Sequence, residues 1–379
     1  MKYLLLLIFL ITIGCADNRK DVLLLGESNI LVNDDEIEVI IPDSIYTNVD
    51  YVKLETSRDA IIRGIDKIVI DDYIYILDQA QDEIFIFEND GSFVAKLNKR
   101  GQGPEEYISI SDFFVQKEFL YILSPATQSI KVYNIKNDFA FTENISVHGY
   151  YYQFHIIGEY IYLYSDFSSE ELRNIATYNI ETHEIENRYQ SFPSEQIGIG
   201  HRDFRVFFNW RDTLYSTFPY EYSIYKLSTN ESEKIENFNF GKEHMYPLNL
   251  RKASSDDRKN YLINNTHDYW IVQDIENLII TNSSYVFSFN YLASNYTVIQ
   301  NRKSGEAIWG YIIQTKSYPL ATPFIHYYMD NKVIQIIDVE MIINAKNSPL
   351  GMNIPEDIAN VDYDANPILG IYTLKEKYQ

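Results

Sequence analysis

The sequence predicts an all-β protein, a six-bladed β-propeller with four-stranded antiparallel blades and small helical insertions. The first observation is composition: the 379 residues include 33 tyrosines and 21 phenylalanines but only 15 glycines. Aromatic residues suit the pleated, half-buried surfaces of strands. The second observation is an aromatic strand motif with markers at Tyr75, Tyr121, Tyr162 and Tyr215, spaced by 46, 41 and 53 residues. Four-stranded units that repeat every 40 to 50 residues or so are typical of propeller blades.

The motif is a short strand in which tyrosine and aliphatic residues alternate. Its first three copies, at residues 73–77, 119–123 and 160–164, are nearly identical, and a shorter copy lies at 213–216. Weaker counterparts at 277–280 and 332–335 bring the number of units to six. In each unit an apolar strand precedes the motif and two further strands follow it, so the motif is interpreted as the second strand of its blade.

The first unit shows the full order of a blade. The turn Asn89-Asp90-Gly91 is a strong hairpin signal, because Gly91 can adopt the positive φ that such turns require. Consecutive hairpins of this kind predict an antiparallel sheet. The four predicted strands of this unit are residues 65–70, 73–78, 83–88 and 93–97.

Two stretches interrupt the repeat. Residues 250–268 lengthen the distance between the fourth and fifth units, and Ser254 begins a pattern typical of a capped helix. Residues 344–366 do the same near the end, where Pro355 can open a short helix before a final strand at 367–372.

The chain before the first unit contains two predicted strands, at residues 36–41 and 49–54. An unpaired strand at the edge of a sheet invites aggregation. We therefore expect one of these two strands to close the ring by pairing with the last blade.

Residues 1–14 are predicted to be a secretory signal peptide. The apolar run at residues 4–13 follows a charged start and is too short for a membrane span of about 20 residues. Residues 11–15 resemble a bacterial lipobox, with Thr12 where leucine is commoner. The resemblance implies cleavage before Cys15 and acylation of its thiol. The alternative is an ordinary signal peptide with an incidental cysteine.

This start of the chain sets the expected domain organisation and location. We expect a lipidated N-terminus and linker at residues 15–40 and the propeller at residues 41–379. The lipid would anchor the protein to the outer membrane of the cell envelope, facing either the periplasm or the exterior.

Charge and cysteine content exclude several classes of function. The chain carries 32 basic and 54 acidic residues, a net charge of −22, and has no basic cluster longer than Lys99-Arg100. A nucleic-acid-binding protein needs a basic face to displace counterions, so that class is excluded. The single cysteine excludes an intramolecular disulfide and a CxxC metal site. No Gly-x-Ser-x-Gly or His-Glu-x-x-His motif occurs.

Several segments together resemble a known family. They include residues 51–56, 66–68, 75–78, 84–87 and 90–91, followed by the loop 100–107 with the sequence Arg-Gly-Gln-Gly-Pro-Glu-Glu-Tyr. They are similar to the six-bladed propeller lipoproteins of Bacteroidota, relatives of NHL-repeat proteins, over residues 45–125. Glu105 stands where that family often has glycine. The resemblance implies a six-bladed ring tethered to a cell envelope and brings no established activity.

The glycines of the loop at residues 99–107 resemble a phosphate-binding loop only superficially, because no helix follows. The loop is interpreted as a turn between blades, with Tyr107 packing back onto a blade.

Propellers usually bind ligands in the central funnel, so polar residues on the innermost strands are the candidate ligand-binding residues. These strands are predicted at residues 66–70, 112–115, 153–157, 202–208, 271–275 and 324–329. Their polar members are Asp66, Asp112, Gln153, His155, Arg205, Gln273 and His326.

The favoured function is a binding or scaffold module that presents its funnel or loops to a glycan, peptide or partner protein. The alternative is an envelope hydrolase or lyase in which His155, Arg205 and His326 act on a small substrate, which requires these side chains to share one pocket. A purely structural role would instead predict an exposed apolar face.

No cofactor or metal site is predicted. Calcium needs several converging oxygen ligands, and Asp362 and Asp364 are better interpreted as a solvated loop than as a calcium site. The two histidines could form a metal pair, but their spacing matches no motif. Aromatic residues that could stack on sugar rings or pack between blades are Tyr150, Tyr151, Tyr152, Tyr220, Tyr222, Tyr327 and Tyr328.

Overall fold

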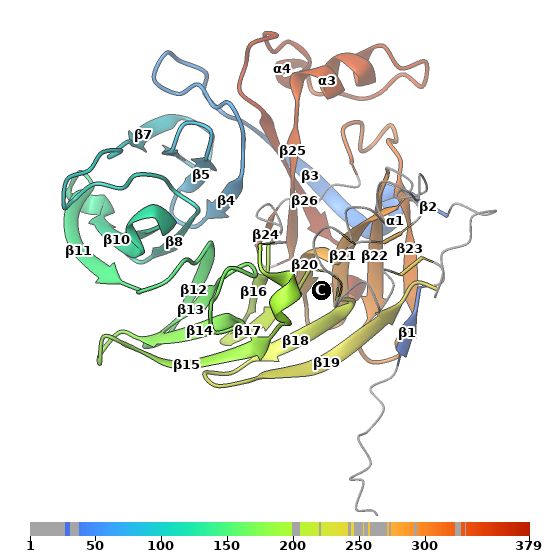
Figure 1. Cartoon of the computed structure of the whole chain (residues 1–379). Coiled ribbons are helices and arrows are strands. Elements are labelled where there is room, and N and C mark those ends of the chain that lie inside the picture. The colour runs from blue at the N-terminus through green and yellow to red at the C-terminus, as the bar shows by residue number, and fades with distance from the viewer. Residues whose placement is uncertain are drawn as a thin grey trace, which may run out of the picture.

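The computed structural model shows six blades arranged as a ring (Figure 1). Each blade is an antiparallel sheet of four strands, which confirms the predicted fold class. The structure describes residues 27–30, 38–198, 205–219, 221–241, 244–245, 253, 257, 271–272, 274–291, 294–322, 327–329 and 331–379. Of the capped helix predicted after Ser254, only Asp257 is among these residues, and it is helical. The lipobox with Cys15 lies outside them.

The first three blades are formed by consecutive strands, from the innermost to the outermost. Blade one contains β4 (Lys67–Ile70), β5 (Ile74–Asp78), β6 (Glu83–Phe87) and β7 (Phe93–Leu97). Blade two contains β8 (Asp112–Gln116), β9 (Phe119–Ser124), β10 (Ser129–Asn134) and β11 (Ala140–Ser146). Blade three contains β12 (Gln153–Ile157), β13 (Tyr160–Tyr164), β14 (Arg173–Asn179) and β15 (Glu184–Ser191).

Blades four and five follow the same order, and each gains a short parallel strand on its outer edge. Blade four contains β16 (Phe207–Trp210), β17 (Thr213–Ser216), β18 (Ser223–Leu227) and β19 (Ser232–Asn239), with β1 (Glu27–Asn29) beside β19. Blade five contains β20 (Glu276–Ile280), β21 (Ser284–Tyr291), β22 (Ser294–Asn301) and β23 (Ala307–Ile312), with β2 (Val39–Ile40) beside β23.

Blade six closes the ring. Its first three strands are β24 (Tyr327–Met329), β25 (Lys332–Ile337) and β26 (Ile368–Leu374). The outermost strand is β3 (Tyr46–Lys53), which comes from the start of the chain and pairs antiparallel with β26. This pairing confirms the expected closure, in which an N-terminal strand covers the open edge of the last blade.

In the part of the chain that the structure describes, the helices are few and short. Helix α1 (Pro42–Ile45) precedes β3, and helices α3 (Val339–Lys346) and α4 (Glu356–Ala359) lie between β25 and β26. The predicted insertion near the end is therefore confirmed, with α4 directly after Pro355. Among the described residues, 3₁₀ turns are η1 (Pro125–Thr127), η2 (Ile135–Asn137), η3 (Ser194–Gln196) and η6 (Glu376–Tyr378). No helix in the described part of the chain is long and apolar enough to cross a membrane.

Two strand predictions were misplaced. The inner strand of blade four, predicted at residues 202–208, is β16, at Phe207–Trp210. Residues 271–275 were predicted as the inner strand of blade five, whereas that strand is β20, at Glu276–Ile280. The motif at 277–280 is thus the first strand of its blade, and β21 is the second. Both strands alternate between two buried faces, so the period-two pattern alone does not distinguish them once an insertion has interrupted the repeat.

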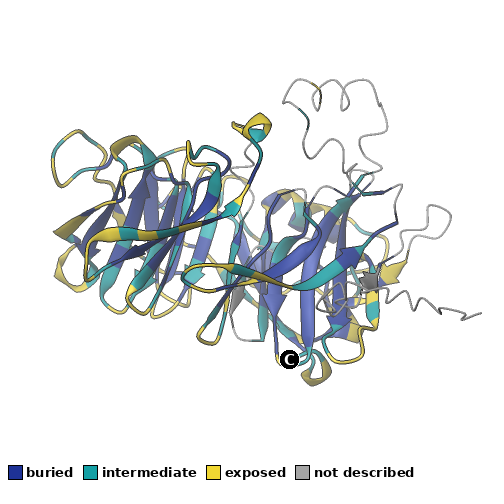
Figure 2. Cartoon of the chain, turned by 60° about the horizontal axis from the view of Figure 1, so that its bottom comes forward, coloured by how far each residue is buried: buried dark blue, intermediate teal, exposed yellow. Residues whose placement is uncertain are grey.

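The core lies between the blades rather than within any one of them. Each pair of neighbouring blades shares one apolar cluster, and the last of these joins blade six to blade one. Because both faces of a middle strand are covered, all five residues of β5 and of β6 are buried. Figure 2 shows this distribution, with buried residues in the strands and exposed residues in the loops at the rims.

The turns bear out two local predictions. Gly91 has a φ of 91°, and a Cβ at this position would lie 2.2 Å from the carbonyl oxygen of Lys53, so glycine is required there. Tyr107 is fully buried against blade one, and its hydroxyl donates a hydrogen bond of 2.9 Å to the carbonyl of Asp82. The loop before Tyr107 is therefore a turn between blades, as predicted.

Candidate functional site

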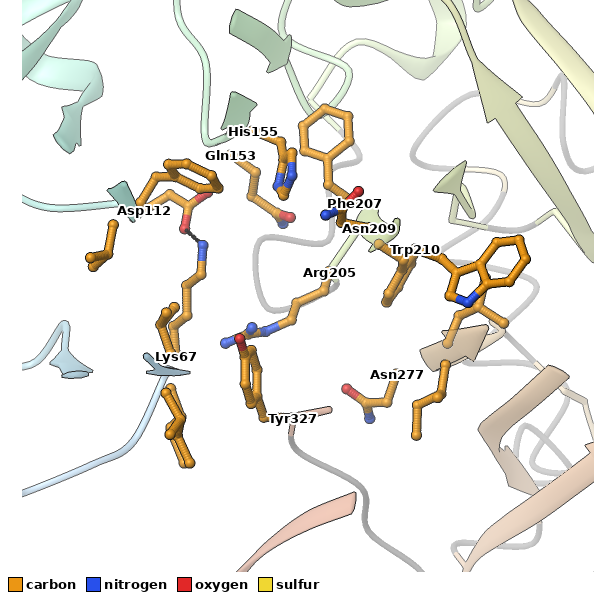
Figure 3. Close-up of a pocket in the computed structure, with 18 of the residues that line it drawn as sticks. Lys67, Asp112, Gln153, His155, Arg205, Phe207, Asn209, Trp210, Asn277 and Tyr327 are labelled. Atoms are coloured by element: carbon orange, nitrogen blue, oxygen red, sulfur yellow. Dashed lines mark hydrogen bonds and ion pairs between the residues drawn. The ribbon is translucent and has the colours of Figure 1, made fainter. Parts of the chain in front are cut away.

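A cavity of about 1300 Å³ lies at the centre of the ring, lined by residues of all six inner strands (Figure 3). The blades follow one another in chain order and each begins with its inner strand, so the six inner strands run in the same direction. Their first residues therefore gather at one end of the cavity. One polar lining residue from each blade lies at or next to this start: Lys67, Asp112, Gln153, Arg205, Asn277 and Tyr327.

An ion pair joins the first two blades at this end. The Lys67 ammonium lies 2.6 Å from Oδ1 of Asp112 and also donates a hydrogen bond of 2.7 Å to the Phe113 carbonyl. The side chains are 18% and 7% exposed, respectively. Burial lowers the pKa of Lys67, and the Asp112 carboxylate opposes that shift by favouring the charged form.

The Asp112 carboxylate also connects to the third blade. Its Oδ2 accepts a hydrogen bond of 2.9 Å from the backbone N–H of Phe154, at the start of β12. Its Oδ1 accepts a second backbone bond of 2.9 Å from Phe113. With Lys67, these contacts give the buried carboxylate three donors from three blades.

Arg205 reaches into the cavity from the segment before β16. Its Nη2 donates a hydrogen bond of 2.9 Å to the backbone carbonyl of Asp66. Figure 3 shows the guanidinium in the middle of the cavity, near Tyr327. Burial lowers the pKa of Arg205, while the nearby charge of Asp112 raises it. The adjacent backbone is held by Gln153, whose Oε1 accepts a bond of 3.1 Å from the N–H of Val206.

His155 lies deeper along the same wall of the cavity. Its ring packs edge-on against Phe114, with 4.8 Å between ring centroids. Burial, helped by the positive charge of Lys67, lowers the pKa of His155 to about 3. The imidazole is therefore neutral near pH 7 and far from the pKa that suits a general base at that pH.

At the other end of the cavity the Trp210 ring is contacted by two cations, of which Arg211 lines the cavity and Arg302 does not. The guanidinium carbons of Arg211 and Arg302 each lie 4.5 Å from the ring centroid of Trp210. Arg211 donates a hydrogen bond to the side-chain oxygen of Asn282, and Arg302 donates one of 2.5 Å to the carbonyl of Thr281.

The structure brings together five of the seven predicted ligand-binding residues. Asp66, Asp112, Gln153, His155 and Arg205 all line the cavity. Gln273 and His326 lie outside the described residues, so the clustering required for the hydrolase or lyase hypothesis is tested only for His155 and Arg205, which share the cavity.

Sequence reasoning missed several polar cavity residues, among them Lys67, Asn209, Arg211 and Asn277. Lys67 was passed over in favour of its neighbour Asp66, although a lysine inside an apolar strand is itself a signal of a paired charge. Asn277 was assigned to a second strand and so was not considered as a funnel residue.

The other proposed sites separate into packing and surface positions. Tyr151 and Tyr222 are buried, so they pack between blades, whereas Tyr150 is 54% exposed. Tyr220 lies outside the described residues, as does the side chain of Tyr328. Asp362 and Asp364 are exposed. Among the described residues, no group of three or more histidine, cysteine or acidic side chains is arranged to hold a metal ion.

The family model described as "Domain of unknown function (DUF4934)" matches residues 29–373 of the chain. No protein with a curated description matches it. Among solved structures, the chain is similar to a protein of Bacteroides fragilis named as a predicted exported protein. The two share 16% identity and a TM-score of 0.72, over 93% of this chain and 100% of that one.

A second similar structure is a member of the DUF4221 family from Bacteroides vulgatus. It shares 10% identity and a TM-score of 0.55, over 90% of this chain and 99% of the other. At these identities the two likenesses show a common fold.

Proposed function

This chain belongs to the DUF4934 family, and we propose that it is a lipid-anchored binding module of the cell envelope. The observation that carries the proposal is the central cavity, to which every blade contributes a polar side chain. The rigid ring fixes these side chains in advance, so a ligand would not have to order the site on binding. The ligand would be part of a glycan, a peptide or a partner protein.

Binding is favoured over catalysis by the chemistry of the polar end. Both oxygens of Asp112 accept hydrogen bonds from donors of the protein, and His155 is neutral with a lowered pKa. The His155 imidazole is therefore not poised to exchange a proton near pH 7. The same groups are well suited to hold a fixed pattern of donors and acceptors around a ligand.

A thermal-shift screen of the full chain in detergent tests the binding proposal, since a ligand that binds only the folded state raises the melting temperature. Neutral and acidic oligosaccharides and short peptides form the panel. Asn209, which lines the cavity, is replaced by alanine, and Asn187→Ala on the outer strand β15 is the matched control. We expect a ligand of the panel to raise the melting temperature of the wild type and of Asn187→Ala, but not that of Asn209→Ala. If no ligand raises the melting temperature of the wild type, the proposal is refuted.

The anchor is proposed from the lipobox resemblance at Cys15, and the similarity to a protein named as exported supports an extracytoplasmic location. Metabolic labelling with a palmitate analogue, followed by membrane fractionation, tests it. We expect label and membrane association in the wild type and loss of both in Cys15→Ser. Equal labelling of the two proteins would contradict lipidation at this residue.

A further inference from the structure

We propose that the cavity binds an acidic oligosaccharide, of the uronic acid class, with Arg205 as the anchor of a sugar carboxylate. This inference rests on the proposed binding function and names its ligand. It begins from a mismatch between the charge of the whole chain and the bonding of the arginines at the cavity.

Arg205 is bonded to a neutral acceptor and not to a described carboxylate. In a chain with 54 acidic and 32 basic residues, an arginine near the core is expected to meet a carboxylate. Yet the hydrogen bond of Arg205 goes to a neutral acceptor, the Asp66 carbonyl at 2.9 Å, and no described carboxylate forms an ion pair with it. A guanidinium has five N–H donors. Those not used by Asp66 remain for a ligand in the cavity.

The carboxylates of Asp112 and Asp66 already accept hydrogen bonds from other groups of the protein. Both oxygens of Asp112 accept hydrogen bonds from donors of the protein, including the Lys67 ammonium. The carboxylate of Asp66 accepts a bond of 2.7 Å from the backbone N–H of Gln79. An incoming anion would therefore compete with no existing salt bridge for Arg205, and it would meet the fork geometry that arginine offers to carboxylates.

A second cation, Arg211, lines the opposite end of the cavity. Its guanidinium lies over the ring of Trp210, and its hydrogen bond also goes to a neutral oxygen, that of Asn282. Arg211 forms no ion pair with a described carboxylate. Positive groups at both ends of one cavity favour a ligand with repeated negative charges over a ligand with one.

Aromatic and amide side chains also line the cavity. The rings of Phe207 and Tyr327 match the apolar face of a pyranose ring. The amides of Asn209 and Asn277 can both donate to and accept from hydroxyl groups. The volume of about 1300 Å³ exceeds the roughly 300–1000 Å³ of ordinary small-molecule pockets. These features together fit a short acidic sugar chain.

Isothermal titration calorimetry on the full chain in detergent tests this inference with three probes. They are a trisaccharide of galacturonic acid, the same trisaccharide as its neutral methyl ester, and a tetraglutamate peptide. We expect the acid to bind at least about tenfold more tightly than the ester, since hydrogen bonds to charged groups are the stronger class. Binding should also weaken as salt is added.

The matched variants are Arg205→Gln and Arg188→Gln. Arg188 lies on the outer strand β15, away from the cavity, and its loss removes the same charge. Arg205→Gln should weaken binding of the acid at least about tenfold while Arg188→Gln leaves it unchanged. Arg205→Lys should give an intermediate loss, because lysine keeps the charge without the fork. Melting temperatures of all three variants check that each is folded.

The outcomes separate this inference from the proposed function. Equal binding of acid and ester, or unchanged binding by Arg205→Gln, would overturn the anchor role and leave a neutral-ligand module standing. Binding of tetraglutamate alone would overturn the sugar assignment in favour of an acidic peptide. Binding of none of the three probes would overturn the inference, and the wider thermal-shift panel would then decide the binding function separately.

Discussion

Replacing Asp112 with alanine should lower the free energy of unfolding by roughly 3 kcal/mol, because the carboxylate ties three blades together. The substitution leaves the backbone N–H groups of Phe113 and Phe154 without their acceptor. An unsatisfied buried donor costs about 1–3 kcal/mol, so the two together cost about 2 kcal/mol at the lower limit.

The loss of the ion pair adds to this cost. Removing one partner of a buried pair typically costs about 3–5 kcal/mol. Lys67 keeps its bond to the Phe113 carbonyl and is 18% exposed beside the cavity, so water can partly solvate the ammonium. We therefore assign about 1 kcal/mol to this part. Asp112→Asn, which keeps one acceptor oxygen, should cost about half as much as alanine.

Urea unfolding followed by tryptophan fluorescence measures these changes, with Asp364→Ala as a control that removes an exposed carboxylate. The control should stay within about 0.5 kcal/mol of the wild type. A double-mutant cycle with Lys67→Met should give a coupling energy of about 1 kcal/mol. The reasoning is refuted if Asp112→Ala is as stable as Asp364→Ala, since the carboxylate would then contribute nothing to joining the blades.

Three further predictions follow from buried groups elsewhere. Tyr46→Ala should lower the free energy of unfolding by about 3–5 kcal/mol in urea. Tyr46 is 2% exposed, and its ring centroid lies 5.0 Å from that of Tyr372, where β3 closes the propeller. Tyr363→Ala is the control: Tyr363 is 84% exposed, so the free energy of unfolding should change little. Burial raises the pKa of Glu276 from 4.5 to about 7, so relative to Glu276→Gln the wild type should lose stability as the pH rises from 4.5 through 7, and a flat difference would contradict this. The lowered pKa of His155 predicts no ring protonation in an NMR titration from about pH 8 to pH 5. Relative to His155→Gln, the wild type should lose stability as the pH falls below about 6.5, and a ring titration near that pH would contradict both expectations.

Much of the fold could be predicted from local patterns. The strand motif at residues 73–77, 119–123 and 160–164 marks the second strand of the first three blades, and the turn at Gly91 marks a hairpin. Strand alternation and turn chemistry are properties of neighbouring residues, so they can be recognised without knowledge of the rest of the chain. An insertion precedes β20 and interrupts the repeat. The local pattern therefore no longer showed which strand was the first of its blade, and the inner strand of blade five was predicted several residues too early.

The candidate site depended on contacts that no local pattern records. Asp66, Asp112 and Arg205 could be named as funnel residues because each lies at or next to the start of an inner strand. Their bonding partners could not be predicted from local patterns. Lys67 and Asp112 are 45 positions apart in the sequence, and Arg205 and Asp66 are 139 positions apart. Which polar group neutralises which depends on how the closed ring brings the blades together.

The sequence by itself thus determined the number of blades, the order of strands within most of them and the closure by an N-terminal strand, because each follows from periodicity and edge pairing. The tertiary structure alone decided that Lys67 is neutralised by Asp112 and that Arg205 binds a neutral carbonyl inside a cavity. The physical reason is that burial and charge pairing are set by distances across blades, which exist only once the apolar faces of all six have packed against one another.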